Sequence, residues 1–345
     1  MDPLLFTALL LIGFVVAFAI GSNDEAMAPA VGAGVLSLNI AVVLGGVLTI
    51  IGAMFFGGGV SEKVGSELVS GNEMSIAMIF AIMISMTIWL LLASASKGLP
   101  ISTTQCIVGA VIGIAVVAPF LGKEGWGIAA IDWFIILQIL GGWVLSPIVG
   151  FVISAAVFRV VRKFQSRARG YTGHERQEKV ASYGLAFFLI IVSLSRGGND
   201  VANAVAPLVM LPDFQGTLSF GPFVISGVVV PLLIGGVGMA LGLIVVGRKV
   251  IKTLATEVVT LTPTSALSAS VSVALVMFVG TYLGLPLSGT HVMVAALIAV
   301  GWVSRGPIQM KQVKNILISW VITVPISAIL GVIVFVLLNP FFPMP

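Results

Sequence analysis

The sequence predicts an all-α polytopic membrane protein built from two inverted-topology repeats with broken or re-entrant helices. Composition is the first observation behind this prediction: 59% of the 345 residues are hydrophobic and only 9% are charged, whereas a soluble domain carries roughly 25% charged residues. The second is a series of long uncharged runs, and the third is a polar motif that occurs twice inside apolar sequence. We expect about 10–12 membrane segments, because a helix needs ~20 residues to cross a bilayer.

The first half of the chain, residues 1–158, contains five long apolar segments and one short one. We expect membrane helices at 4–20, 39–57, 74–96, 101–119 and 131–158, with a short additional segment at 24–36. No Lys or Arg precedes the first segment and no clear cleavage site follows it. We therefore interpret this segment as a retained helix and not as a signal peptide.

A basic stretch separates the two halves. Residues 159–179 read RVVRKFQSRARGYTGHERQEK and hold seven Lys or Arg against two Glu. Basic loops stay on the cytoplasmic side of a membrane, so we predict that 159–179 is a cytoplasmic loop. The segment 305–314 is also basic and is followed by one helix, whereas the N-terminal MDPLL has no Lys or Arg. Both termini are therefore predicted outside, in a multi-pass protein of the plasma membrane.

The second half, residues 180–345, repeats the pattern of the first. We expect helices at 181–195, 219–246, 262–283, 290–304 and 315–338, and a short segment at 201–211. The chain would enter the first half from outside and the second half from the cytoplasm. This opposite orientation is the inverted-repeat arrangement of many secondary transporters.

The duplicated motif reads GSNDEAMA at 21–28 and GGNDVANA at 197–204. An aspartate in an apolar segment is costly unless it is buried in protein, paired or facing water. Glycine permits both helix unwinding and close backbone approach, and an unwound point offers the oxygen ligands that a hard cation such as Na⁺ prefers. The candidate cation ligands are Asn23, Asp24, Asn199, Asp200 and Asn203, with Asp24 and Asp200 as the metal ligands if the cation is Na⁺. The alternative is a structural helix break in which the aspartate caps the next helix.

A second pair of segments, LPISTTQ at 99–105 and LPLSGTH at 285–291, follows the first pair in each half. Proline disfavours helix at the residue before it, so the hydroxyl residues lie where a new helix begins. Free N–H groups, hydroxyls and the positive end of the helix dipole can bind an oxyanion there. The candidate anion ligands are Ser102, Thr103, Thr104, Gln105, Ser288, Gly289, Thr290 and His291. The alternative is that Ser and Thr merely cap their helices.

These motifs, together with GRKVIKT at 247–253, resemble the inorganic phosphate transporter (Pit) family. Its signature is Gly-Ala-Asn-Asp-Val-Ala-Asn-Ala in each half, with Pro-Val-Ser-Thr-Thr-His downstream. The resemblance covers nearly the whole chain. It implies a symporter with inverted repeats that moves inorganic phosphate with Na⁺ or H⁺, and a minority of family-like proteins are thought to carry sulfate.

The chain departs from the family pattern at positions that could bear on ligand binding. Glu25 replaces Val, Met27 replaces Asn, Gln105 replaces His and Gly289 replaces Thr. These departures bear on the coupling ion and the number of cations more than on the fold.

Arg196 lies immediately before the second motif, where the equivalent residue of the first half is Ile20. It could pair with the anion, with Asp200 or with lipid headgroups at the membrane edge. We favour pairing or the membrane edge over contact with the anion.

The functional hypothesis is a secondary active symporter that imports inorganic phosphate by alternating access. Na⁺ is the favoured coupling ion because the candidate ligands are hard oxygens, and H⁺ carried by His291 is the alternative. A sulfate symporter on the same scaffold and an anion channel are the rival functions. No catalytic constellation or cofactor motif is present, so we expect no enzyme activity and no cofactor. The expected partners are phosphate, Na⁺ or H⁺ and the lipid bilayer; a homo-oligomer is possible, and no nucleic acid is expected.

Overall fold

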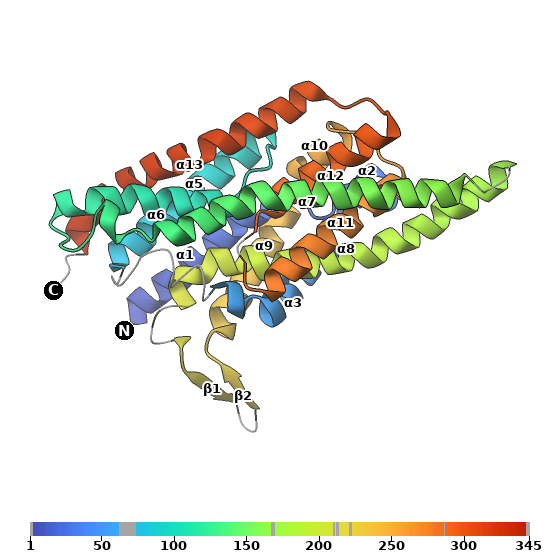
Figure 1. The fold of residues 1–345 in the computed structure, drawn as a ribbon. Helices are drawn as coiled ribbons and strands as arrows, with labels where there is room; N and C mark the ends of the chain where they lie inside the picture. The colour runs from blue at the N-terminus through green and yellow to red at the C-terminus, as the bar shows by residue number, and fades with distance from the viewer. Residues whose placement is uncertain are drawn as a thin grey trace.

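The computed structural model describes residues 3–61, 74–166, 170–209, 211, 214–220, 223–285 and 287–342. Most of these residues lie in helices that run roughly along one common direction (Figure 1). Among them, eight helices are long and apolar enough to cross a membrane, and the pair Val229–Val245 and Arg248–Thr256, bent by 61°, raises the number to nine if it counts as one span. A shorter apolar helix, Gly289–Ser304, adds a further segment. The prediction of an all-α polytopic membrane protein is confirmed.

Four helices of the first half begin where the sequence supplies a capping side chain. A side-chain oxygen of Ser37, Ser75, Ser102 or Asp132 accepts the first free N–H groups of a helix. The elements are α1 (Pro3–Gly21), α2 (Ala28–Gly32), α3 (Leu38–Phe56), α5 (Ile76–Lys97), α6 (Thr103–Val117) and α7 (Trp133–Gln165), with 3₁₀ turns at Ala118–Leu121 and Ile128–Ala130.

The second half uses the same devices. Thr262 and Ser265 form a capping box before α11, and Ser288 caps α12. The elements are α8 (Gly170–Val209), β1 (Thr217–Phe220), β2 (Phe223–Ser226), α9 (Val229–Gly242), a π segment at Leu243–Gly247, α10 (Arg248–Thr256), α11 (Pro263–Tyr282), α12 (Gly289–Ser304), α13 (Met310–Leu338) and a last 3₁₀ turn at Asn339–Phe341.

The helices of the two halves pack against one another in equivalent pairs. α1 packs against α9, and its counterpart α8 packs against α3. In the same way α13 packs against α5 and α6, whereas its counterpart α7 packs against α11 and α12. Every one of these contacts maps onto another when the halves are interchanged, which is the pattern expected of two structural repeats. Both hydrophobic clusters of the core draw residues from both halves.

The ends of the chain and the connection between the halves lie at opposite ends of the molecule. Figure 1 shows the N- and C-termini at one end, and the α7–α8 connection at the far end. A second basic connection, between α12 and α13, lies toward that far end, where the Arg162 side chain donates to the Val303 carbonyl at 3.4 Å.

The prediction that 159–179 is a loop is wrong. α7 continues to Gln165 and α8 begins at Gly170, so most of the stretch is helical, and 167–169 lie outside the described residues. The long charged side chains are good helix formers. Glu178 also anchors the extension of α8, because its carboxylate accepts the N–H and the hydroxyl of Thr264, at 3.0 and 2.9 Å, at the start of α11.

The predicted break between 195 and 201 is also wrong, because α8 runs unbroken through the second motif. Arg196 and Asp200 form an i, i+4 ion pair on this helix, which favours the helical conformation. Gly197 serves close packing instead of unwinding: a Cβ atom there would lie 2.4 Å from the Thr49 carbonyl oxygen of α3.

The expected helix 219–246 begins later than predicted. β1 and β2 pair antiparallel, with Thr217 opposite Ser226 and Leu218 opposite Ile225, and α9 starts only at Val229; 221–222 lie outside the described residues. The two strands are rich in β-branched and aromatic residues, which favour strands over helix.

We predict that Gly21→Ala destabilises the protein by about 2 kcal/mol or more, because overpacking a tight contact typically costs ~1–3 kcal/mol. A Cβ atom at Gly21 would lie 1.9 Å from the Met239 carbonyl oxygen of α9. Gly141→Ala in α7 is the matched control, because nothing lies within 4 Å of its Cβ position. The thermal unfolding midpoint of the purified protein in detergent measures both. Equal midpoints for the two variants would show that the α1–α9 contact is not tight.

Candidate functional site

The first motif forms a sharp turn at the centre of the molecule. α1 ends at Gly21, and the Asp24 carboxylate accepts the backbone N–H of Ala26 at 3.0 Å, a local bond that competes with helix. Asp24 and Glu25 are 2% and 0% exposed. The predicted helix break is therefore present in the first half, and it buries two adjacent carboxylates.

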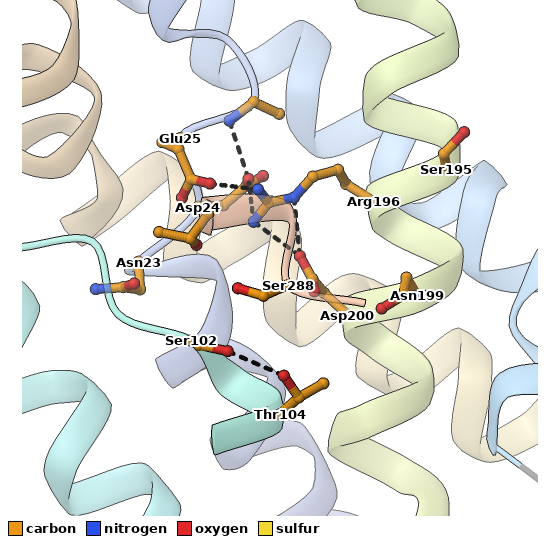
Figure 2. A network of polar contacts seen from close by, with 12 residues as sticks. Asn23, Asp24, Glu25, Ser102, Thr104, Ser195, Arg196, Asn199, Asp200 and Ser288 are labelled. Carbon is orange, nitrogen blue, oxygen red and sulfur yellow. Dashed lines mark hydrogen bonds and ion pairs between the residues drawn. The ribbon is translucent and has the colours of Figure 1, made fainter. Parts of the chain in front are cut away.

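The second motif presents its aspartate from the middle of α8. Asp200 is 2% exposed, and its carboxylate accepts from the Arg196 Nε at 3.0 Å. The two motifs thus bring their aspartates to one place from two different backbone conformations. Figure 2 shows Asp24 and Asp200 on either side of the Arg196 side chain.

The two motif asparagines hold the broken segments that precede α6 and α12. Asn23 donates to the Leu99 carbonyl at 2.9 Å and accepts the Ile101 N–H at 2.8 Å. Asn199 makes the equivalent bond to the Leu285 carbonyl at 2.9 Å. Their amides therefore support the segment before each helix start, an architectural task in addition to the predicted cation binding.

The starts of α6 and α12 lie close together in the structure. Thr290 donates to the Ile101 carbonyl at 3.4 Å, which links the two LP segments. Ser102 and Ser288 accept the N–H groups of Gln105 and His291 at 3.4 and 3.3 Å. These two serines are N-caps. For their side chains, the structure therefore shows helix capping, which was the alternative to anion binding.

Three side-chain atoms at these helix starts are buried and lack partners in the described chain. Gln105 Oε1 and both ring nitrogens of His291 have no hydrogen-bond partner among the described residues, although both side chains are less than 10% exposed. Buried polar groups are normally satisfied. The first N–H groups of a helix also have no acceptor within that helix. The paired helix starts therefore offer hydrogen bonds to a polar ligand.

Two tryptophans flank these helix starts at equivalent positions of the repeats. Trp143 of α7 donates to the Thr104 hydroxyl at 3.1 Å, and Trp320 of α13 donates to the Pro100 carbonyl at 3.2 Å. The Trp320 ring also lies against His291, with 3.9 Å between the ring centroids. Our sequence analysis missed this pair. Their 177-residue separation, close to the 176 between the two Asn-Asp motifs, was the signal that could have found them.

Arg196 is the centre of a buried charge cluster. Its Nε and Nη2 donate to Asp200 Oδ2 at 3.0 and 2.9 Å, Nη2 lies 3.4 Å from Asp24 Oδ1, and Nη1 donates to Glu25 Oε1. Arg196 is 3% exposed. The expectation that it pairs with Asp200 is confirmed, and the membrane-edge alternative is excluded. Glu25 was not among the predicted site residues, because its partner lies 171 residues away.

The cation candidates are not equivalent in the two halves. Asn203 is buried on α8 with neither amide atom paired within the described chain. Its counterpart Met27 packs in an apolar environment, where a Cβ atom on Gly45 would lie 3.2 Å from its Cγ. No three His, Cys, Asp or Glu side chains of the described ranges are arranged to hold a metal ion. A cation site here would combine one or two carboxylates with amide and carbonyl oxygens, which suits a hard monovalent ion.

Comparisons with known proteins agree with this geometry. Residues 20–331 match the family model described as "Phosphate transporter family". The protein named "Putative phosphate permease" in Pyrococcus furiosus is 30% identical, with 97% of this chain and 96% of that protein covered. "Inorganic phosphate transporter 2-1, chloroplastic" of Arabidopsis thaliana is 28% identical over 96% of this chain and 71% of its own length.

A solved structure named "The sodium-dependent phosphate transporter" shares this fold. It superposes with a TM-score of 0.83 at 27% identity and covers 97% of this chain and 99% of its own. The family model spans both Asn-Asp motifs and both helix starts. This chain belongs to the phosphate transporter family.

Proposed function

We propose that this protein is a symporter that imports inorganic phosphate together with Na⁺ by alternating access. Membership of the phosphate transporter family supports phosphate transport, and the relatives are named as phosphate permeases or transporters. The observation that carries the finer proposal is the meeting of two helix starts, each with unpartnered buried polar atoms, beside a cluster of buried carboxylates. Such a site can hold an anion and a cation next to each other.

The proposed phosphate ligands belong to the starts of α6 and α12. Thr103, Thr104 and Gln105 face the site from the first half, and Gly289, Thr290 and His291 from the second. The amides of the first helical turn, the dipoles and the side-chain groups stabilise the anion. Ser102 and Ser288 act through their caps, because they fix the conformation in which these amides point into the site.

The coupling ion is proposed to bind beside the phosphate, among the oxygens of the two Asn-Asp motifs. Asn199 Oδ1 and Asn203 Oδ1 are buried and free of partners in the described structure, and Asn23, Asp24 and Asp200 lie in the same region. Oxygen ligands suit Na⁺, and the structural neighbour is named as sodium-dependent. A bound cation offsets the charge of the anion, so each ligand raises the affinity for the other.

Phosphate is favoured over sulfate by the carboxylates. Phosphate can donate a hydrogen bond at neutral pH and sulfate cannot, and Glu25 Oε2 is a buried acceptor without a partner in the described chain. A site with such an acceptor rejects an anion that lacks the proton, because the acceptor is then left unpaired.

Alternating access is proposed to use the shared packing of the halves. The site lies between helix starts of both repeats, and α7 and α13 each pack on α6 or α12. Rocking of one set of helices against the other would expose the site to each side in turn.

The first prediction from this proposal is uptake of labelled phosphate into proteoliposomes, driven by an inward Na⁺ gradient. Excess sulfate should inhibit this uptake far less than the same excess of unlabelled phosphate. Equal inhibition by sulfate would support a sulfate symporter, whereas uptake that depends on no cation gradient would support a channel. Uptake driven by a proton gradient alone would replace Na⁺ by H⁺.

The second prediction concerns the two unpartnered side chains. Gln105→Leu and His291→Phe should each weaken phosphate binding about tenfold or more, because a hydrogen bond to a charged ligand contributes ~1.5–3 kcal/mol. Their thermal stability should not fall, since Gln105 Oε1 and the two ring nitrogens of His291 have no hydrogen-bond partner within the described protein. Ser268→Ala is the matched control, because that buried hydroxyl only bonds the Thr264 carbonyl of its own helix. Unchanged phosphate affinity in both variants would remove these helix starts from the proposed site.

We propose that the protein lies in the plasma membrane. Both termini would then be outside the cell, and the ends of α7 and α8 that adjoin each other would be in the cytoplasm. Ser166 is exposed at the end of α7, and the single Cys106 is buried. In a Cys106→Ser background, a Ser166→Cys variant should resist an impermeant thiol reagent on intact cells and react after lysis. Ready labelling of intact cells would reverse the orientation.

A further inference from the structure

Arg196 fills the space between the aspartates of the two repeats. Its Nη2 lies 2.9 Å from Asp200 Oδ2 and 3.4 Å from Asp24 Oδ1, so a single nitrogen contacts one carboxylate from each half. This is the position at which two converging carboxylates attract a cation most strongly. The side chain reaches it from α8 while remaining 3% exposed, and Figure 2 shows it crossing the gap toward the first motif.

Glu25 is the residue that balances this arginine. The second repeat has Val201 at the equivalent position, so the repeat itself does not require a carboxylate there. Glu25 is fully buried and accepts a hydrogen bond from Arg196 Nη1. Burying a charge is costly unless it is paired. Glu25 and Arg196, which come from opposite halves of the chain, form such a pair.

Gly289 is the residue that admits the arginine. The first repeat has Thr103 at the equivalent position. A Cβ atom at Gly289 would lie 2.6 Å from Arg196 Nη1 and 2.8 Å from its Cζ. The glycine is not among those of the described chain with a positive φ, so its backbone does not require it. Space for the guanidinium is therefore the structural reason for glycine here.

We propose that Arg196 is a resident cation that occupies the position between Asp24 and Asp200 that a mobile cation would otherwise fill. This arrangement depends on three positions at which the repeats differ: Ile20/Arg196, Glu25/Val201 and Thr103/Gly289. A mobile Na⁺ at the same position would be repelled by the guanidinium and would have to displace its hydrogen bonds. Na⁺ then uses other oxygens of the motifs, and the chain binds one mobile cation fewer than it would without the arginine.

The charges are consistent with a role that is added to cation coupling and does not replace it. Three carboxylates surround one guanidinium, so the cluster keeps an excess of negative charge when all its groups are ionised. That excess would oppose a phosphate anion nearby. The proposal thus rests on the proposed function, in which mobile cations still accompany phosphate, and it concerns how many of them bind.

The test measures Na⁺ binding without phosphate, on the purified full-length protein in detergent. The thermal midpoint is followed as NaCl replaces choline chloride at constant ionic strength, for the wild type and for Arg196→Gln/Glu25→Gln. This double change removes one charge of each sign, so the net charge of the cluster is kept. The slope of stability against the logarithm of Na⁺ concentration reports the number of ions bound. We expect the slope of the double variant to exceed that of the wild type by about one ion.

Three further variants make the result specific. Arg248→Gln, which removes an arginine that contacts Asn39 at the surface, should keep the wild-type slope. Arg196→Lys retains a positive charge at this position and should also have the wild-type slope. Gly289→Ala should displace the guanidinium, a movable side chain, and raise the slope; it decides the question if the double variant does not fold.

An identical Na⁺ slope in the wild type, the double variant and Gly289→Ala would overturn the proposal. So would a wild-type slope that falls by one ion in Asp200→Asn, because the carboxylate would then already hold Na⁺ beside the arginine. Phosphate uptake is not part of this readout. Failure of the symport proposal would therefore appear in the uptake experiment and not here.

Discussion

The guanidinium of Arg196 connects the two halves of the chain through carboxylates that could not be buried without it. Asp24 and Glu25 come from the turn after α1, and Asp200 comes from the middle of α8. Each is almost fully excluded from solvent, and an unpaired charge in such a place is expensive. The cluster therefore dictates that the turn after α1 and the central part of α8 lie together, and the starts of α6 and α12 converge beside it.

The architecture around this cluster is symmetric, whereas the cluster itself is not. Helix packing and the asparagine bonds to Leu99 and Leu285 follow the repeat, as do the sequence positions of Trp143 and Trp320. The departures from symmetry are concentrated in the buried charge cluster around Arg196. Asp24 lies in a turn, but Asp200 lies in an unbroken helix that its own pair with Arg196 supports. The two repeats thus form a single polar centre, to which the first contributes a turn and the second an unbroken helix.

The sequence predicted the class of fold and singled out the two motif pairs, because both depend on patterns that recur in each half. Uncharged runs located most of the helices, and the duplicated motifs located Asp24, Asp200 and the two helix starts. The unbroken helix α8 was missed because glycine was interpreted as a break, although Gly197 serves close contact with α3. Glu25 was missed because its role exists only through Arg196, which is far away in sequence and supplied by tertiary packing.

An experimental structure of the protein with phosphate and Na⁺ bound would test the place of Arg196 most directly. We expect an anion at the starts of α6 and α12, in contact with Gln105 and His291. We also expect the Arg196 guanidinium between Asp24 and Asp200, with Na⁺ coordinated by other oxygens of the motifs. A Na⁺ ion between the two aspartates, with the arginine side chain turned away, would show that Arg196 is not a resident cation.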